Sequence, residues 1–287
     1  MELTRLSELR PRTVWDVLDD AFDLYRERFT LLAGIAAVPF VPAHLLNALL
    51  TTLAYQRLQD SVGKEAEATN VFIPLLIFLG AYLIGQPILL IARAIQYAVT
   101  AVAIEDRLRG MEPSAKRAWK QVLPSILPIT LATLGLVFLM AFVYAASCGV
   151  LIFLGLPFMA LIPVCIGLEK RKLVDGFKRG WLITKYNFGR SLGLTTLIFL
   201  IEFALAFGLG VLVGLFFSLI PGQSSDPQSS KSFVWSEAAQ AIAALFIAPL
   251  GGVASTLFYF DCRVRREGLD MAALAAETNV PLAEVPQ

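Results

Sequence analysis

Long uncharged stretches of apolar residues alternate along this chain with short clusters of charged residues. No residue between Arg28 and Arg57 carries a formal charge, and residues 68–92 and 238–260 are uncharged in the same way. About 20 predominantly apolar residues in a helix are enough to cross the hydrocarbon core of a bilayer, which is about 30 Å thick. The pattern therefore predicts several transmembrane helices.

The longest uncharged stretch, residues 121–168, is too long for one crossing, because a helix of that length would measure roughly 72 Å. The sequence ASCG at residues 146–149 is the expected turn between two spans. Another stretch, residues 191–220, contains Glu202 as its single charged residue. Six transmembrane helices are predicted, near residues 30–55, 71–104, 122–146, 149–168, 190–220 and 234–260.

The positions of Lys and Arg predict the orientation of these helices. Of the 24 Lys and Arg residues, 20 lie in the N-terminal segment, in the connections after the second and fourth predicted helices, and in the C-terminal tail. Cytoplasmic loops are enriched in Lys and Arg, so both termini are expected in the cytoplasm. The predicted parts are a cytoplasmic segment with an amphipathic interfacial helix (1–28), a six-span membrane domain (29–262) and a cytoplasmic tail (263–287).

The cytoplasmic ends of the second, fourth and sixth predicted helices share one spacing, an acidic residue followed two positions later by Arg. The three pairs are Glu105 with Arg107, Glu169 with Arg171, and Asp261 with Arg263. Arg favours the C-terminal end of a helix and the cytoplasmic headgroups, which accounts for the pattern without any binding role. A contact with a specific lipid or a protein partner is the alternative.

An amphipathic segment precedes the first, third and fifth predicted helices. Residues 13–29 place aromatic and aliphatic side chains at helical spacing, and Thr13 followed by Asp16 is typical of a helix start. This face consists of Trp15, Leu18, Phe22, Tyr25 and Phe29. Residues 172–188 repeat the spacing, and residues 115–126 repeat it more weakly. The fold class expected is an all-α membrane protein built from three parallel repeats, each an amphipathic helix followed by two spans.

Two charged residues lie inside predicted spans, and such residues are candidates for a function. Arg93 lies 12 residues before Glu105, and Glu202 lies 12 residues after Arg190, so both are about 18 Å of helix from a cytoplasmic marker. We expect the two charges at similar depth, where they form an intramembrane pair. The alternatives are that Arg93 extends to the inner interface, or that the two residues handle a substrate or protons.

Composition and motifs argue against several other functions. Hydrophobic residues make up 57% of the 287 and charged residues 16%, and the net charge of +1 suggests no polyanionic partner such as nucleic acid. The chain has no HExxH zinc motif and no P-loop. Its single histidine, His44, is expected to serve packing or hydrogen bonding. No catalytic residue, metal ligand or cofactor is expected.

The sequences VWDVLDDAFDLYRERF (14–29) and FYFDCRVRREGLD (258–270) resemble a bacterial family named for the membrane domain of glycerophosphoryl diester phosphodiesterase. The resemblance implies about six spans with an N-terminal amphipathic helix, in the bacterial cytoplasmic membrane. In the full enzymes a separate soluble barrel carries the chemistry, and the 27 residues after Phe260 are far fewer than the roughly 250 of such a barrel. The resemblance therefore implies no catalytic residue here.

The function expected from these observations is that of a non-enzymatic scaffold or regulatory protein. Its expected partners are the lipid bilayer and either an anionic phospholipid or another membrane protein. The alternative is a transporter or lipid-handling channel with a path between the three repeats. A water-filled axis would favour the channel, whereas an axis packed with Leu, Phe and Gly would favour the scaffold.

Overall fold

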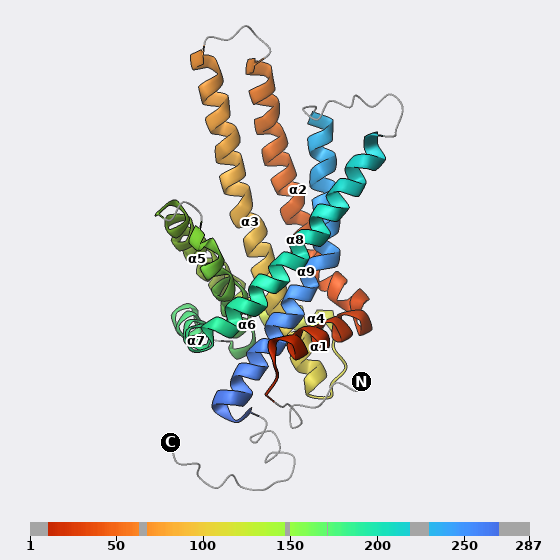
Figure 1. Cartoon of the computed structure of the whole chain (residues 1–287), viewed down its shortest axis with the longest axis vertical. Helices are drawn as coiled ribbons and strands as arrows, with labels where there is room; N and C mark the ends of the chain where they lie inside the picture. The colour runs from red at the N-terminus through yellow and green to blue at the C-terminus, as the bar shows by residue number, and fades with distance from the viewer. Residues whose placement is uncertain (1–10, 63–67, 147–149, 171, 219–229, 270–287) are drawn as a thin grey trace. The chain divides into compact units, whose positions relative to one another are not determined.

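The computed structural model describes residues 11–62, 68–146, 150–170, 172–218 and 230–269. All regular structure within these ranges is helical (Figure 1). The helices are α1 (Val14–Glu27), α2 (Phe29–Val62), α3 (Ala68–Leu108), α4 (Ala115–Val122), α5 (Ile126–Ala146), α6 (Leu156–Glu169), α7 (Leu173–Tyr186), α8 (Phe188–Ser218) and α9 (Ser230–Glu267), with 3₁₀ helices at Leu123–Ser125 and Val150–Gly155.

Five helical segments within the described residues are long and apolar enough to cross a membrane. They are Phe29–Asp60, Leu75–Leu108, Ala115–Val143, Phe188–Leu212 and Ala238–Glu267. Each coincides with one of the predicted spans. The protein is therefore an all-α, multi-pass membrane protein.

The fourth predicted span, residues 149–168, differs from the other five. The expected turn at residues 147–149 lies outside the described residues. The segment begins with the 3₁₀ helix Val150–Gly155 and continues as α6, whose 14 residues measure about 21 Å. As an α-helix alone, α6 is shorter than a bilayer core, and its residues from Ala160 to Gly167 are all buried. The difference between five long helices and six predicted spans rests on this one segment.

The helix start predicted at Thr13 is confirmed. The Thr13 hydroxyl accepts a hydrogen bond from the backbone N–H of Asp16, and the Asp16 carboxylate accepts one from the backbone N–H of Thr13. This capping box pairs two backbone donors at the start of α1 that the helix cannot pair internally.

The buried face of α1 is not the aromatic stripe that was predicted. Leu18 is buried as expected, but Trp15 and Phe22 are exposed, with 64% and 37% of their surface accessible. The residues fully covered by neighbours are instead Val17, Ala21 and Leu24. The small Ala21 is therefore covered by neighbours, and the large rings of Trp15 and Phe22 are not.

In α4 and α7 as well, a small residue directly before a tryptophan is buried. In α4 Ala118, directly before the aromatic Trp119, is fully buried together with Val122 of the predicted face. In α7 the buried residues are Gly176, Gly180, Ile183 and Thr184, and Gly180 stands directly before Trp181. A single position along a helix corresponds to a rotation of about 100°, so a large ring at the flank leaves the preceding small residue at the contact.

The chain divides into two compact units whose boundaries fall inside α2, α3, α8 and α9. Unit 1 comprises Met1–Ile35, Ala94–Phe199 and Pro249–Gln287, and unit 2 comprises Ala36–Arg93 and Leu200–Ala248.

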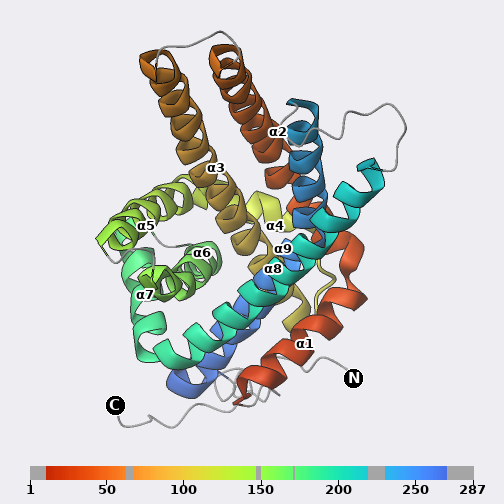
Figure 2. The same cartoon turned by 45° about the horizontal axis from the view of Figure 1, so that its top comes forward.

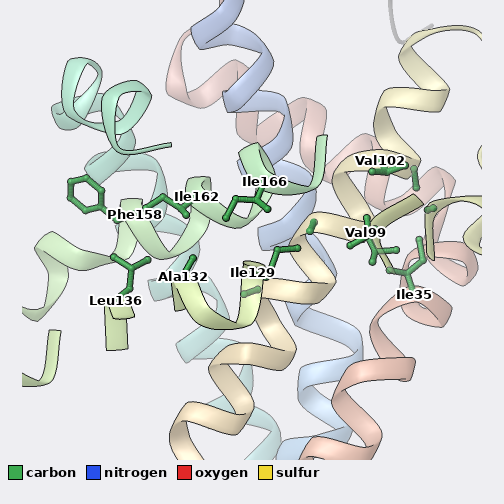
Figure 3. Close-up of a cluster of buried hydrophobic side chains, with 14 residues drawn as sticks. Ile35, Val99, Val102, Ile129, Ala132, Leu136, Phe158, Ile162 and Ile166 are labelled. Carbon is green, nitrogen blue, oxygen red and sulfur yellow. The ribbon is translucent and has the colours of Figure 1, made fainter. Parts of the chain in front are cut away.

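Unit 1 is organised around α6. Figure 2 shows α6 beside α5 and α7, and these three helices contact one another. The apolar core draws side chains from the first turns of α2 and from α3, α4, α5 and α6 (Figure 3). Its labelled members are Ile35, Val99, Val102, Ile129, Ala132, Leu136, Phe158, Ile162 and Ile166.

Three glycines of unit 1 stand where two helices approach most closely. A Cβ on Gly180 of α7 would lie 2.8 Å from the Ile162 Cα atom of α6. A Cβ on Gly167 of α6 would lie 3.1 Å from the Ala98 Cα atom of α3. A Cβ on Gly252 of α9 would meet the side chains of Gln96 and Thr100 of α3. Small residues at helix contacts are typical of membrane proteins, where close packing replaces the hydrophobic driving force.

Unit 2 combines an apolar contact between helices with a polar stripe on α2. Phe40 and Ala43 of α2 pack with Ala92 of α3 and Ala248 of α9. One face of α2 carries buried polar side chains, and the residues between them expose apolar ones. The buried polar residues are His44, Asn47 and Thr51, and the exposed apolar ones are Leu45, Leu46, Leu49 and Leu53. Such an arrangement suits a helix with lipid on its outer side.

Candidate functional site

The structure brings the two charged residues of the predicted spans together inside unit 2. Arg93 Nη2 donates a hydrogen bond of 2.7 Å to Glu202 Oε2. The Glu202 side chain is 8% exposed and that of Arg93 is 36% exposed. A carboxylate without a partner would be costly within a membrane, so the Arg93 contact stabilises its charged form there.

The two carboxylate oxygens of Glu202 differ in their hydrogen bonding. Glu202 Oε1 is buried and has no hydrogen-bond partner among the described residues. A buried polar atom of this kind normally binds a protein group or an ordered water. The pair therefore retains one acceptor position inside unit 2.

His44 is buried on the polar face of α2, as expected for packing. Its ring lies 6.1 Å from the ring of Phe40, and its Nδ1 atom has no hydrogen-bond partner among the described residues. No group of three His, Cys, Asp or Glu side chains within the described residues has the arrangement of a metal site.

The three junction acids have different surroundings, all within unit 1. Glu105 accepts hydrogen bonds from Arg109, four residues further along α3. Glu169 Oε1 accepts from the Tyr259 hydroxyl at 2.7 Å and from Arg179 Nε at 3.1 Å. Asp261 is the most deeply buried of the three, with 1% of its side chain exposed.

The predicted junction arginines also diverge. Arg107 Nη2 donates to Glu27 Oε1 at 3.1 Å, which connects the ends of α3 and α1. Arg263 lies 5.7 Å from the ring centroid of Tyr259, and its Nε donates to Glu267. Arg171 lies outside the described residues. In the two junctions that are fully described, neither Glu105 nor Asp261 pairs with the arginine two positions later, because residues i and i+2 point to different sides of a helix.

Asp261 contacts a residue from the opposite end of the chain. Its Oδ1 atom accepts the backbone N–H of Arg12 at 2.7 Å, and its Oδ2 atom accepts Arg190 Nη2 at 2.8 Å. Arg265, one turn further along α9, donates from Nε to the same carboxylate. Both arginines also donate to the backbone carbonyl of Arg12, at 2.7 Å from Arg190 and 2.8 Å from Arg265.

The helices α4 and α7 and the segment before α1 each contact the end of a long helix or of α6. Arg117 of α4 forms an ion pair of 3.5 Å with Asp106 at the end of α3. Arg179 of α7 pairs with Glu169 at the end of α6, and also with Glu267. At the end of α9, the backbone of Arg12 takes this place next to Asp261, and its side chain pairs with Asp20 of α1 at 2.6 Å.

Several of these charges have shifted pKa values. The hydrogen bond from the Thr13 backbone lowers the pKa of Asp16 below its ordinary value. Burial raises the pKa of Asp20, and the Arg12 charge opposes this shift without cancelling it. Burial acts to lower the pKa of Arg179, but its hydrogen bonds to Glu169 and Glu267 outweigh burial and raise it.

One sequence pattern qualifies the expected absence of catalytic motifs. Residues 189–193, GRSLG, match the GxSxG pattern that surrounds the nucleophile of α/β-hydrolases. That nucleophile stands exposed on a sharp turn between a strand and a helix. Ser191 instead lies within α8 and is fully buried, so the geometry does not fit this role.

The contact of Asp261 with Arg12 and Arg190 was not predicted from the sequence. Asp261 itself stood out because the acid-x-Arg spacing occurs three times, but spacing does not reveal which distant residue an acid contacts.

In comparisons with known proteins, no family model, no curated protein and no solved structure matches this chain.

Proposed function

We propose that this protein is a non-enzymatic scaffold or regulatory protein of a bacterial cytoplasmic membrane, acting by contact with another membrane protein or with anionic lipid. In this proposal the chain crosses the bilayer six times and both termini are cytoplasmic. Three parallel repeats, each of an amphipathic helix and two spans, form the membrane part. The family resemblance seen at residues 14–29 and 258–270 belongs to the same proposal.

The observation that carries the scaffold function is the core of unit 1. Its buried members are all Ala, Val, Leu, Ile or Phe, and they come from five consecutive helices. Two stacked rings, Phe158 and Trp181 with centroids 4.3 Å apart, extend this packing to α7. The close packing of these side chains supports a structural role for the cluster, although unit 1 also buries polar residues such as Gln96, Thr100 and Ser255.

The three amphipathic helices support the repeat. Each contains a charged residue, a small residue and an aromatic residue in succession, in the segments Asp20–Phe22, Arg117–Trp119 and Arg179–Trp181. The small residue is buried in all three. In the second and third of these segments the charged residue pairs with the acidic end of the preceding helix, at Asp106 and Glu169.

The six-span topology is supported by charge distribution. If residues 150–169 did not cross the bilayer, the seven basic residues from Lys170 to Arg190 would lie on the side opposite to the N-terminal segment. The enrichment of Lys and Arg in cytoplasmic loops disfavours that arrangement. The 3₁₀ helix adds about 12 Å to the 21 Å of α6, which together match the thickness of a bilayer core.

The scaffold function is tested by site-specific photocrosslinking in native membranes. A photoreactive residue at Met111, exposed in the connection between α3 and α4, is expected to yield one discrete protein adduct. The same residue at Phe138, exposed on α5 within an apolar span, is the matched lipid-facing control. Equal adduct patterns from both positions, or only lipid adducts at Met111, would contradict a cytoplasmic protein contact.

The second candidate function, transport or lipid handling, is favoured by the polar interior of unit 2. His44, Asn47 and Thr51 face inward on α2, and Glu202 keeps one buried acceptor atom. Reconstitution in liposomes separates the two functions. Movement of a fluorescent phospholipid between leaflets that depends on the protein and is lost in Glu202→Leu would replace the scaffold proposal.

A further inference from the structure

The contacts around Asp261 have a feature that a surface ion pair lacks: they bind a backbone peptide group. The Arg12 N–H donates to the carboxylate of Asp261, and the Arg12 carbonyl accepts from both Arg190 and Arg265. The donor and the acceptor of one residue are thus held by three charged side chains. Hydrogen bonds to charged groups are stronger than those between neutral groups.

Other contacts hold the side chains of Asp261, Arg190 and Arg265 in place next to the Arg12 peptide group. Arg190 stands at the start of α8, with its guanidinium carbon 5.4 Å from the ring centroid of Phe258 on α9. Arg265 is fixed by its own bond to Asp261, one helical turn away. Asp261 is buried, so its charge is satisfied by these donors and not by bulk water. An acid buried in this way is costly if its partners leave.

We propose that Asp261, Arg190 and Arg265 form a peptide-binding site that latches the N-terminal segment of this chain to the end of α9. The ligand class is an extended polypeptide segment, recognised through its backbone at Arg12, directly before the cap of α1. Release of this residue frees α1, whose buried residues Val17, Ala21 and Leu24 then become available to another surface. The latch therefore controls whether α1 is docked.

The contrast between the backbone and side chain of Arg12 gives a sharp test. Arg12→Pro removes the N–H that Asp261 binds, whereas Arg12→Ala keeps the whole peptide group and removes the side chain that pairs with Asp20. Hydrogen exchange of the full-length protein in detergent is measured over residues 14–27. We expect exchange about tenfold faster or more in Arg12→Pro, and close to wild type in Arg12→Ala.

A second pair of variants tests the carboxylate. Asp261→Asn is expected to speed exchange over residues 14–27 as Arg12→Pro does. Glu105 stands at the corresponding position of α3 and contacts Arg109 on its own helix. Glu105→Gln is therefore expected to have little effect on exchange over residues 14–27. Slow exchange in the core residues of α5 and α6 shows that each variant is folded.

Two results would overturn the latch. Equal exchange in Arg12→Pro and Arg12→Ala would show that the N–H of residue 12 contributes nothing to the docking of α1. Unchanged exchange over residues 14–27 in a folded Asp261→Asn protein would show that α1 docks without the carboxylate. If Asp261→Asn fails to fold, the comparison at residue 12 decides alone, because that residue lies outside any helix.

Discussion

Arg93 of α3 and Glu202 of α8 are 109 positions apart in the chain, yet the Arg93 Nη2 atom lies 2.7 Å from the Glu202 Oε2 atom. Each lies in a helix that is otherwise apolar for several turns. Both charges belong to unit 2, and the pair neutralises them where water is scarce. Its contribution to stability and its contribution to function can be measured separately.

A double-mutant cycle tests the energetic coupling of this pair. Arg93→Leu alone leaves the buried Glu202 carboxylate without its partner, and loss of one partner of a buried pair typically costs about 3–5 kcal/mol. The double variant Arg93→Leu/Glu202→Leu is expected to lose less than the sum of the single variants. The measurement is the unfolding midpoint in one detergent, and additive losses would show that the two charges act independently.

The close contact between α7 and α6 predicts an unusual sensitivity at Gly180. Gly180→Ala places a methyl group 2.8 Å from the Ile162 Cα atom, so the helices must separate, at a typical cost of about 1–3 kcal/mol. Gly193→Ala is the matched control, since a Cβ there meets no atom within 4 Å. In a helix that change is expected to be neutral or slightly stabilising. Thermal unfolding in detergent compares the two, and equal midpoints would contradict the close contact.

The six-span topology predicts which loops face outward. Single cysteines at Ser61 and Ser225, in a protein without native cysteines, are expected to react with an impermeant reagent in intact cells. A cysteine at Ser114, before α4, is expected to react only after lysis. Ser225 lies outside the described residues, and it distinguishes five crossings from six because its side of the membrane depends on residues 150–169. Labelling of Ser61 without Ser225 would exclude the sixth crossing.

The cap of α1 predicts a pH dependence. Because the pKa of Asp16 is lowered in the folded protein, its carboxylate stabilises α1 above the ordinary pKa near 3.8. This stabilisation is lost as the pH falls through the lower pKa of the folded state. The unfolding midpoint of Asp16→Asn is therefore expected to lie below wild type at pH 6, with the difference shrinking towards pH 3. Asp23→Asn, exposed on the same helix and outside the cap, is the control and is expected to leave the midpoint close to wild type.

Short-range features of this protein were determined by the sequence. Five long apolar helices follow from stretches without charge, because a bilayer core excludes unpaired charges whatever the neighbouring helices are. The capping box of Thr13 and Asp16 was predictable because both of its hydrogen bonds lie within one helical turn. Even the approach of Arg93 and Glu202 followed from counting helical rise from charged markers on either side.

Other features were decided by tertiary structure. In α1 the sequence pointed to Phe22, but the buried position is Ala21, one residue earlier, because the packing of neighbouring helices decides which side of a helix is covered. Likewise, the repeated acid-x-Arg spacing marked Asp261 and Arg263 as a unit, yet the acid contacts Arg12 and Arg190. Side chains two positions apart on a helix point to different sides. The partner of a buried acid is therefore set by the distant backbone or helix end that packs against it.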